Sequence, residues 1–171
     1  EFKTKSTFKN KSPGDWYYEQ QLLGFNYRMN DLEAALGISQ LKRIDKFIKK
    51  RNEFAQRYNK KLDKLPLQLP IDIDGCLSSF HLYIINVDIH KSNISHPNIF
   101  KELRKANIGV NLHYIPIYKQ PFYKKFGFNA DAFPNSEAYH KSAISLPIFP
   151  DMTISEQNYV IETLMKIFLE K

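Results

Sequence analysis

Cysteine is nearly absent from this sequence of 171 residues, in which Cys76 is the single example. One cysteine excludes an internal disulfide framework and is typical of a reducing compartment, so we expect a cytoplasmic protein. No apolar run approaches the roughly 18 to 20 residues that cross a bilayer, and no signal-peptide pattern opens the chain. Secreted, disulfide-stapled and membrane-spanning proteins are therefore the classes that we do not expect.

Glycine is also scarce, with six residues, and neither a Gly-x-Gly-x-x-Gly loop nor a P-loop occurs. A Ser-His-Asp triad would lack the Gly-x-Ser-x-Gly elbow. No histidine has a second one four residues on, and no cysteine or carboxylate completes a zinc set, so no metal site is expected. The five histidines are His81, His90, His96, His113 and His140. The sequence thus lacks a self-contained catalytic constellation.

Basic residues outnumber acidic ones, 25 to 18, for a formal net charge of +7. This excess has two interpretations: an anionic partner, or a lysine-rich solvated surface. The second is favoured, because the lysines are interleaved with carboxylates and the aromatic residues do not alternate with them as in a base-stacking platform. A non-catalytic basic domain that binds an anionic partner or nucleic acid through the lysine-rich face of a long helix stays open as an alternative.

Apolar residues make up 43% of the chain and aromatic residues 14%, which indicates a globular protein. Apolar residues recur at helical spacing from Asp31 to Leu62, after an N-cap at Asn30 with Glu33 three residues on. Unbroken, this helix would measure roughly 48 Å. Because that exceeds the width of a small domain, we expect the helix to kink or to bridge two bodies.

Strands and helices alternate after Pro66 and Pro70, which end the long helix. The patterns predict strands at 80–87, 108–114 and 144–148, and helices at 96–107, 122–126, 136–142 and 153–169. This order predicts an α/β (α+β) fold with a small sheet covered by helices.

Two polar segments are candidate binding sites. The first, Gly24 to Asp31, places the amide of Asn26 and the guanidinium of Arg28 before a helix N-terminus, where they could bind a phosphate or sugar oxygen. The alternative is that Arg28 pairs with Asp31 or Glu33 and braces the loop. Both interpretations stay open on the chemistry of these residues alone.

The second segment, Asn111 to Tyr118, is a strand end that turns into a proline loop. Alternation places Asn111 and His113 on one face and Leu112 and Tyr114 on the other. Polar groups at strand ends commonly line ligand sites. The alternative is a half-exposed strand whose histidine is satisfied by the backbone.

These segments carry a family resemblance. The run from Gly24 to Leu41 closely resembles the signature of the DegT/StrS-type nucleotide-sugar aminotransferases, pyridoxal-phosphate enzymes of the aspartate-aminotransferase fold. Three landmarks follow in family order: His113-Tyr114-Ile115-Pro116, Gln120-Pro121 and Ile144-Ser145-Leu146-Pro147. Pro13 to Glu19 resembles the branch that acts in pseudaminic-acid synthesis. The similarity spans nearly the whole sequence but matches the C-terminal half of such an enzyme.

The resemblance implies the small C-terminal domain of a fold-type I aminotransferase, with a largely antiparallel sheet. It divides the chain into a loop remnant of the large cofactor domain (1–29), a long linking helix (30–64) and a small α/β domain (65–171). Family members are homodimers with shared active sites, and Asn26 matches the asparagine that reaches the neighbouring site, near cofactor phosphate and substrate. Asn111, His113 and Tyr114 match residues that contact the nucleotide-sugar, and Arg28 is a candidate brace of its loop.

The cofactor implied by the resemblance is pyridoxal 5'-phosphate, which needs a Schiff-base lysine and a carboxylate at the pyridine nitrogen. In the family both lie in the large N-terminal domain, and no lysine of this chain stands in the family's context. We therefore expect no catalytic residue here, and neither tight cofactor binding nor transamination by this chain alone. The parent would transfer an amino group from glutamate to the C4 ketone of a UDP-linked 4-keto-6-deoxy-N-acetyl sugar, with no nucleic acid or membrane as partner.

Overall fold

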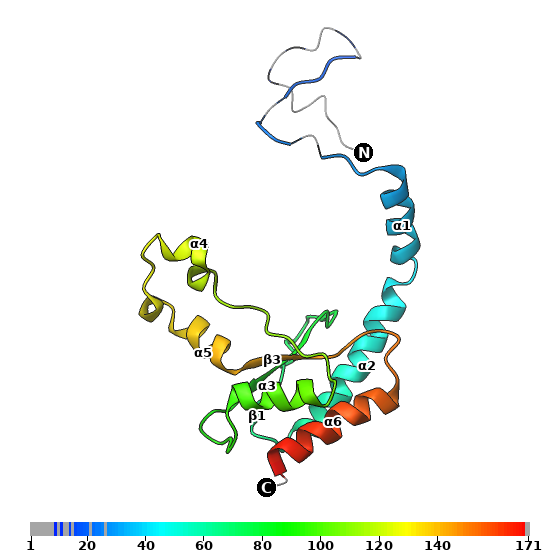
Figure 1. The fold of residues 1–171 in the computed structure, drawn as a ribbon. Coiled ribbons are helices and arrows are strands. Elements are labelled where there is room, and N and C mark those ends of the chain that lie inside the picture. Colours follow the sequence, from blue (N-terminus) through cyan, green and yellow to red (C-terminus); the bar gives the residue numbers. More distant parts are fainter. Residues whose placement is uncertain are drawn as a thin grey trace. The chain divides into compact units, whose positions relative to one another are not determined.

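The computed structural model describes residues 9, 11, 14, 16–20, 22–25 and 27–169. The chain divides into two compact units, residues 1–40 and residues 41–171, and each is described by itself. Figure 1 shows the elements of both units. None of the helices within the described ranges is long and apolar enough to cross a membrane.

The first unit contains helix α1 (Asp31–Leu41) except for its last residue. Its start is the expected capping box: Asn30 Oδ1 accepts from the Glu33 amide at 2.9 Å, and Glu33 Oε2 accepts from the Asn30 amide at 3.1 Å. These two bonds satisfy orphan donors at the helix start. None of the side chains of α1 is buried, although the helix is rich in leucine, alanine and isoleucine.

The expected long helix is interrupted at Lys42 and Arg43, and α2 (Ile44–Leu62) follows. The guanidinium of Arg43 lies over the ring of Phe47, 5.2 Å from its centroid. The two helices differ in their surroundings, because α2 buries one apolar stripe and α1 buries nothing. The interruption therefore separates an amphipathic helix from one that is apolar on several sides.

A three-stranded antiparallel sheet lies at the centre of the second unit, in the order β1 (Leu67–Gln68), β2 (Tyr83–Val87) and β3 (Ala143–Leu146). Tyr83 pairs with Leu146 and Ile84 with Ser145, so each pair shares a face of the sheet. The sequence patterns did not predict the short strand β1, because two residues carry too little pattern to be recognised.

One face of the sheet forms the core. Alternate residues of β2 are buried on it, as period-two geometry requires. Helices α2, α3 (His96–Lys105) and α6 (Ile154–Leu169) cover this face, and the connecting segments add Leu65, Ile108 and Val110 (Figure 1). The large apolar side chains with no exposed surface include Tyr58, Leu62, Tyr83, Ile85, Ile99, Leu103, Ile144 and Leu164. This small antiparallel sheet with helical cover confirms the expected fold class.

The remaining elements join α3 to β3: η2 (Ile117–Lys119), α4 (Pro121–Lys124), η3 (Ala130–Ala132) and α5 (Pro134–Ser142). Gly127, expected to close the short helical turn, follows α4 with a φ of +73°, a conformation that favours glycine. The capping box of the last helix is present, since Thr153 Oγ1 accepts from the Glu156 amide at 3.1 Å and Glu156 Oε2 accepts from the Thr153 amide at 2.7 Å.

The expected strand at 108–114 is wrong. Only Asn111 pairs, through an isolated bridge to Ser145. Two features explain the difference. Asn111 Oδ1 accepts from the Leu112 amide at 2.8 Å, a local bond that competes with a ladder, and β3 ends at Leu146 before Pro147, which has no amide proton to extend the pairing.

Candidate functional site

The candidate site is the turn from Asn111 to Tyr114, which follows α3 and lies beside β3. Ile108 and Val110 are buried and anchor the segment in the core. The bridge to Ser145 then fixes Asn111, whose carbonyl accepts from the Ser145 amide at 2.8 Å and whose amide donates to the Ser145 carbonyl at 3.4 Å. The bridge thus holds the turn by backbone contacts, while the side chains of Asn111 and Tyr114 are exposed and those of Leu112 and His113 are half-buried.

His113 is held by two side chains from other elements. Its Nδ1 lies 2.8 Å from the Oγ of Ser145 on β3. Its carbonyl accepts from the hydroxyl of Tyr139 on α5 at 3.0 Å. Burial raises the pKa of Tyr139, which keeps that hydroxyl protonated as a donor. The imidazole and the backbone of His113 are therefore fixed separately.

Tyr114 is the exposed residue of the turn, with 72% of its surface accessible. Its ring meets that of His113 edge to face, with centroids 4.7 Å apart and an interplanar angle of 88°. The peptide bond between the two residues is cis. Tyr114 and His113 thus present a joint polar and aromatic surface, beside the exposed Asn111.

The two candidate residues of the first unit differ in what can be said of them. Asn26 lies outside the described residues. Arg28 is exposed, and the carboxylate of Glu33 accepts from the backbone of Asn30 in the capping box. The roles expected for Asn26 and Arg28 stay predictions.

The segment after the turn is tied to α5 by a charged cluster. Glu137 accepts from the ammonium of Lys119 at 2.7 Å and from the hydroxyl of Tyr118 at 2.8 Å, and Lys141 lies 4.0 Å away. The hydrogen bond from Lys119, followed by that from Tyr118, lowers the pKa of Glu137 from its ordinary value. This cluster fixes the loop that carries the candidate turn.

A cavity of about 720 Å³ lies against the sheet face that is opposite the core. It is lined by Ile84 and Asn86 of β2, by Tyr139 of α5 and by parts of the segment 68–82. Ser145 shares this face, because it pairs directly with Ile84. Tyr139 therefore belongs both to the wall of the cavity and to the bonds that hold His113.

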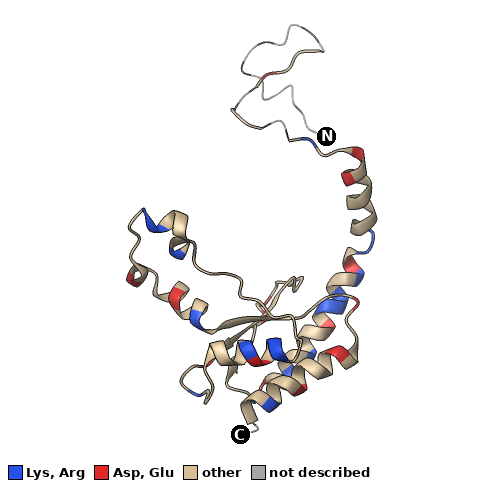
Figure 2. Ribbon diagram, viewed as in Figure 1, with Lys and Arg blue, Asp and Glu red and all other residues tan. Residues whose placement is uncertain are grey.

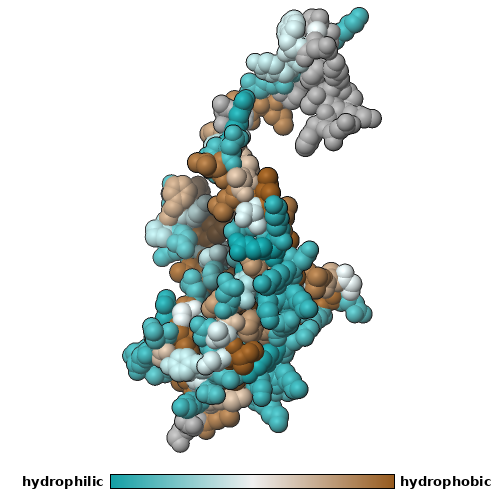
Figure 3. All heavy atoms as spheres, turned by 90° about the vertical axis from the view of Figure 1, so that its right-hand side faces the viewer, coloured by the Kyte–Doolittle hydropathy of each residue, from teal (hydrophilic) through white to brown (hydrophobic). Residues whose placement is uncertain are grey.

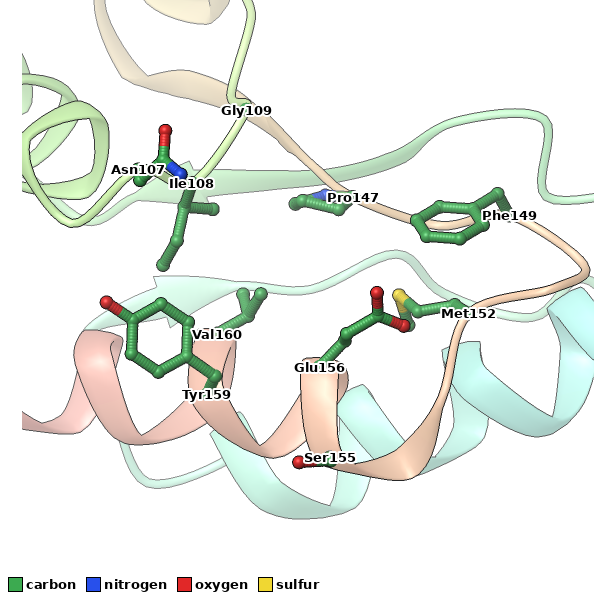
Figure 4. Close-up of a pocket in the computed structure, with 10 residues that line it drawn as sticks. All are labelled: Asn107, Ile108, Gly109, Pro147, Phe149, Met152, Ser155, Glu156, Tyr159 and Val160. Carbon is green, nitrogen blue, oxygen red and sulfur yellow. The ribbon is translucent and has the colours of Figure 1, made fainter.

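Another pocket, of about 710 Å³, lies between α6, the turn 107–109 and the segment 147–152 (Figure 4). It contains none of the candidate binding residues Asn26, Arg28, Asn111, His113 and Tyr114. Two of its polar groups are already engaged, since Glu156 caps α6 and the Tyr159 hydroxyl donates to the Ala106 carbonyl at 2.9 Å. Its lining is mainly apolar and comes from three separate segments, so no sequence motif could have revealed it.

Charge is mixed on the helices of the second unit. Lys and Arg outnumber Asp and Glu on both α2 and α3, with a few acidic residues among them (Figure 2). Lys50 pairs with Glu53 at 2.9 Å, and Lys105 with Glu102 at 2.7 Å. Within the ranges that the structure describes, no group of three or more His, Cys, Asp and Glu could hold a metal ion.

The described residues around His113 supply only part of what pyridoxal phosphate needs. Asn111 offers an amide and His113 an imidazole, whereas the Tyr139 hydroxyl donates to the His113 carbonyl and the Lys119 amine is engaged by Glu137. A cofactor site needs a reactive lysine and a carboxylate at the ring nitrogen. The part of this region that the structure describes does not make a complete site for the cofactor.

Comparisons with known proteins show the family of this chain. The model of the DegT/DnrJ/EryC1/StrS aminotransferase family matches residues 3–165. The spore coat polysaccharide biosynthesis protein SpsC of Bacillus subtilis is 38% identical over 159 residues, covering 91% of this chain and 41% of the relative. A UDP-4-amino-4,6-dideoxy-N-acetyl-beta-L-altrosamine transaminase of Campylobacter jejuni is 37% identical over 157 residues, covering 91% of this chain and 41% of the relative.

A solved structure agrees as well. The PLP form of the sugar aminotransferase Spr1654 of Streptococcus pneumoniae superposes with a TM-score of 0.79 at 29% identity, covering 89% of this chain and 39% of that protein. Its PMP form is also known, which supports pyridoxal phosphate as the cofactor of the parent family. This chain spans about two fifths of the length of the relatives that it matches. The chain belongs to the DegT/DnrJ/EryC1/StrS aminotransferase family.

Proposed function

We propose that this chain is the C-terminal portion of a nucleotide-sugar aminotransferase. The parent would transfer an amino group from glutamate to the C4 ketone of a UDP-linked 4-keto-6-deoxy-N-acetyl sugar, as a step of pseudaminic-acid synthesis. The observation that carries this proposal is the family match over residues 3–165, together with 37% identity to a named transaminase of such a sugar. The exposed Cys76 fits a reducing compartment, so the proposal places the parent in the cytoplasm.

In this proposal the turn at 111–114 contacts the nucleotide-sugar. Asn111, His113 and Tyr114 supply an amide, an imidazole and a phenol, which can bond to phosphate and sugar oxygens without a charged group. The hydrogen bonds that fix the turn support this role, because groups that are already ordered lose little conformational entropy on binding. Asn26 would serve the neighbouring site of a homodimer near the cofactor phosphate, and Arg28 would brace its loop.

The proposal assigns the reactive lysine to the large domain of the parent. This chain alone would then neither hold pyridoxal phosphate tightly nor transaminate. The test mixes the chain with pyridoxal phosphate, removes free cofactor by gel filtration and records the visible spectrum. We expect no absorbance from lysine-bound cofactor, and a stable band that a lysine variant abolishes would contradict this part of the proposal.

The reaction is tested on the full-length parent that contains this chain. With glutamate and the 4-keto sugar, we expect 2-oxoglutarate and the 4-amino sugar in equal amounts. A dehydrated or hydrolysed sugar as the product would contradict the assignment. His113→Gln should raise KM for the sugar, whereas the matched control His90→Gln, at an exposed position in a turn after β2, should not.

The same variants address the alternative of a basic domain that binds an anionic partner. Affinity through lysines falls steeply with salt and ignores the identity of the sugar. A nucleotide-sugar site distinguishes UDP-N-acetylglucosamine from UDP-glucose at constant salt. Binding that depends on salt alone and is unaffected by His113→Gln would favour the basic-domain alternative.

A further inference from the structure

Ser145 is a buried polar residue in an otherwise apolar strand. It is 4% exposed, and its neighbours in β3, Ala143, Ile144 and Leu146, are all buried as well. A buried hydroxyl without a partner costs roughly 1–3 kcal/mol. The side-chain partner of Ser145 within the described residues is His113 Nδ1, at 2.8 Å.

The direction of this hydrogen bond follows from what else is available. The backbone amide and carbonyl of Ser145 are occupied by the bridge to Asn111. The hydroxyl has one proton to donate, and the Nδ1 of His113 is the acceptor within reach. Since a buried donor left unsatisfied is costly, the hydroxyl donates to Nδ1. A neutral imidazole that accepts at Nδ1 carries its own proton on Nε2.

A second contact holds the backbone of His113. The hydroxyl of Tyr139 donates to the carbonyl of His113 at 3.0 Å. The backbone of the turn is therefore tied to α5 while the ring is tied to β3, so rotation about the side-chain bonds of His113 would break the bond to Ser145. Among the residues that the structure describes, no partner bonds Nε2, which is left as the free polar atom of a fixed ring.

We propose that Ser145 is a positioning residue that holds His113 in the Nε2–H tautomer. His113 then presents a hydrogen-bond donor, and the group it recognises is an acceptor oxygen of the ligand, on a phosphate or on the sugar. The consequence for binding rests on the proposed function, whereas the tautomer itself does not. The family landmark Ile144-Ser145-Leu146-Pro147 thereby gains a physical role for its serine.

The tautomer is measured on the ¹⁵N-labelled chain by long-range ¹H–¹⁵N correlation of the imidazole rings at about pH 8, above the ordinary histidine pKa. His113→Gln assigns the signals. We expect a protonated Nε2 and an unprotonated Nδ1 that is shifted upfield by the accepted hydrogen bond. Ser145→Ala should move that Nδ1 signal downfield, and Ser145→Thr, which keeps the hydroxyl, should restore it.

Ser142→Ala is the matched control. Its hydroxyl lies near the same elements and bonds Asn86 Oδ1 and the Ala138 carbonyl, but does not contact His113. The His113 signals should be unchanged in this variant. A proton on Nδ1 in the unsubstituted chain would overturn the proposal, and this measurement does not require any variant to fold. An Nδ1 signal that has the same chemical shift in Ser145→Ala as in the unsubstituted chain would overturn it too. Because no ligand is present, this result is independent of the experiments on sugar binding.

Discussion

The guanidinium of Arg57 on α2 donates to the side-chain carbonyl of Gln157 on α6 at 2.9 Å. Gln157 is completely buried, and its amide in turn donates to the carbonyl of Phe54 at 2.8 Å. A second guanidinium nitrogen of Arg57 donates to Asn158. Two helices that are far apart in the sequence are thus joined by a polar network inside an apolar interface, and this network fixes their register.

Gln157→Leu should destabilise the domain by about 1–3 kcal/mol, because it leaves the Phe54 carbonyl and one Arg57 nitrogen without their partner. The free energy of unfolding is measured by urea denaturation. Gln56→Leu, at an exposed position of α2, is the control and should stay within about 0.5 kcal/mol of the unsubstituted chain. Equal stability of the two variants would show that the network contributes nothing.

Thr153→Ala should destabilise α6 by about 1 kcal/mol, since the hydroxyl accepts from the Glu156 amide at the helix start. Thr163→Ala is the control, because the Thr163 hydroxyl bonds the Tyr159 carbonyl within the same helix and caps nothing. Alanine has the higher helix propensity there. Urea denaturation should therefore separate the two variants, and a loss that is equal in both would contradict a capping role.

The Glu137 cluster predicts a loss of stability in acid. Lys119 and Tyr118 lower the folded-state pKa of Glu137 below the value of the unfolded chain. For a carboxyl whose pKa is depressed by folding, the stabilisation is present above the unfolded pKa, near 4.3, and is lost as the pH falls through the folded pKa. The thermal midpoint should therefore decline as the pH falls through and below this range.

Glu137→Gln removes this titration, so its stability should depend less on pH across the same range, although it is lower at pH 7. Glu102→Gln is the control, because Glu102 pairs with Lys105 on the exposed surface of α3. Exposed ion pairs contribute little to stability. The pH dependence of the stability of Glu102→Gln should therefore follow that of the unsubstituted chain. A Glu137→Gln profile that retains the full slope would place the acid sensitivity elsewhere.

Local signals in the sequence predicted the helices well. The pattern of Asn30 with Glu33, and of Thr153 with Glu156, marks helix starts because the bonds that define it join residues three positions apart. The apolar stripe of the amphipathic helix α2 was also predicted from the sequence. These features depend only on residues that are close together in the chain, so the sequence alone is sufficient to predict them.

The prediction of a strand at 108–114 was wrong because strand formation depends on a partner strand that lies far away in the sequence. Whether Asn111 continues a ladder depends on β3, more than thirty residues later, which ends before Pro147. The same reason explains why Ser145 was not recognised as the residue that holds His113. The candidate turn could be found from its polar residues, whereas the bonds that fix it come from β3 and α5 and required the structure.

Helix α1 leads to the last prediction. Its side chains Leu32 and Leu36 lie one turn apart and are 84% and 61% exposed, and Figure 3 shows hydrophobic surface along this helix. A helix with apolar residues on several sides is normally covered by protein, and contiguous exposed apolar surface marks an interaction site. We therefore expect the chain to self-associate, in keeping with the proposed homodimer.

Replacing both Leu32 and Leu36 with lysine should shift the chain toward monomer in sedimentation velocity, because the two charges would have to be buried at the contact. The urea midpoint of the second unit should not change, since neither side chain is buried in it. Gln40→Lys adds charge to α1 without removing an apolar side chain and should leave association nearly intact. Association that survives the double substitution would exclude α1 as the contact surface.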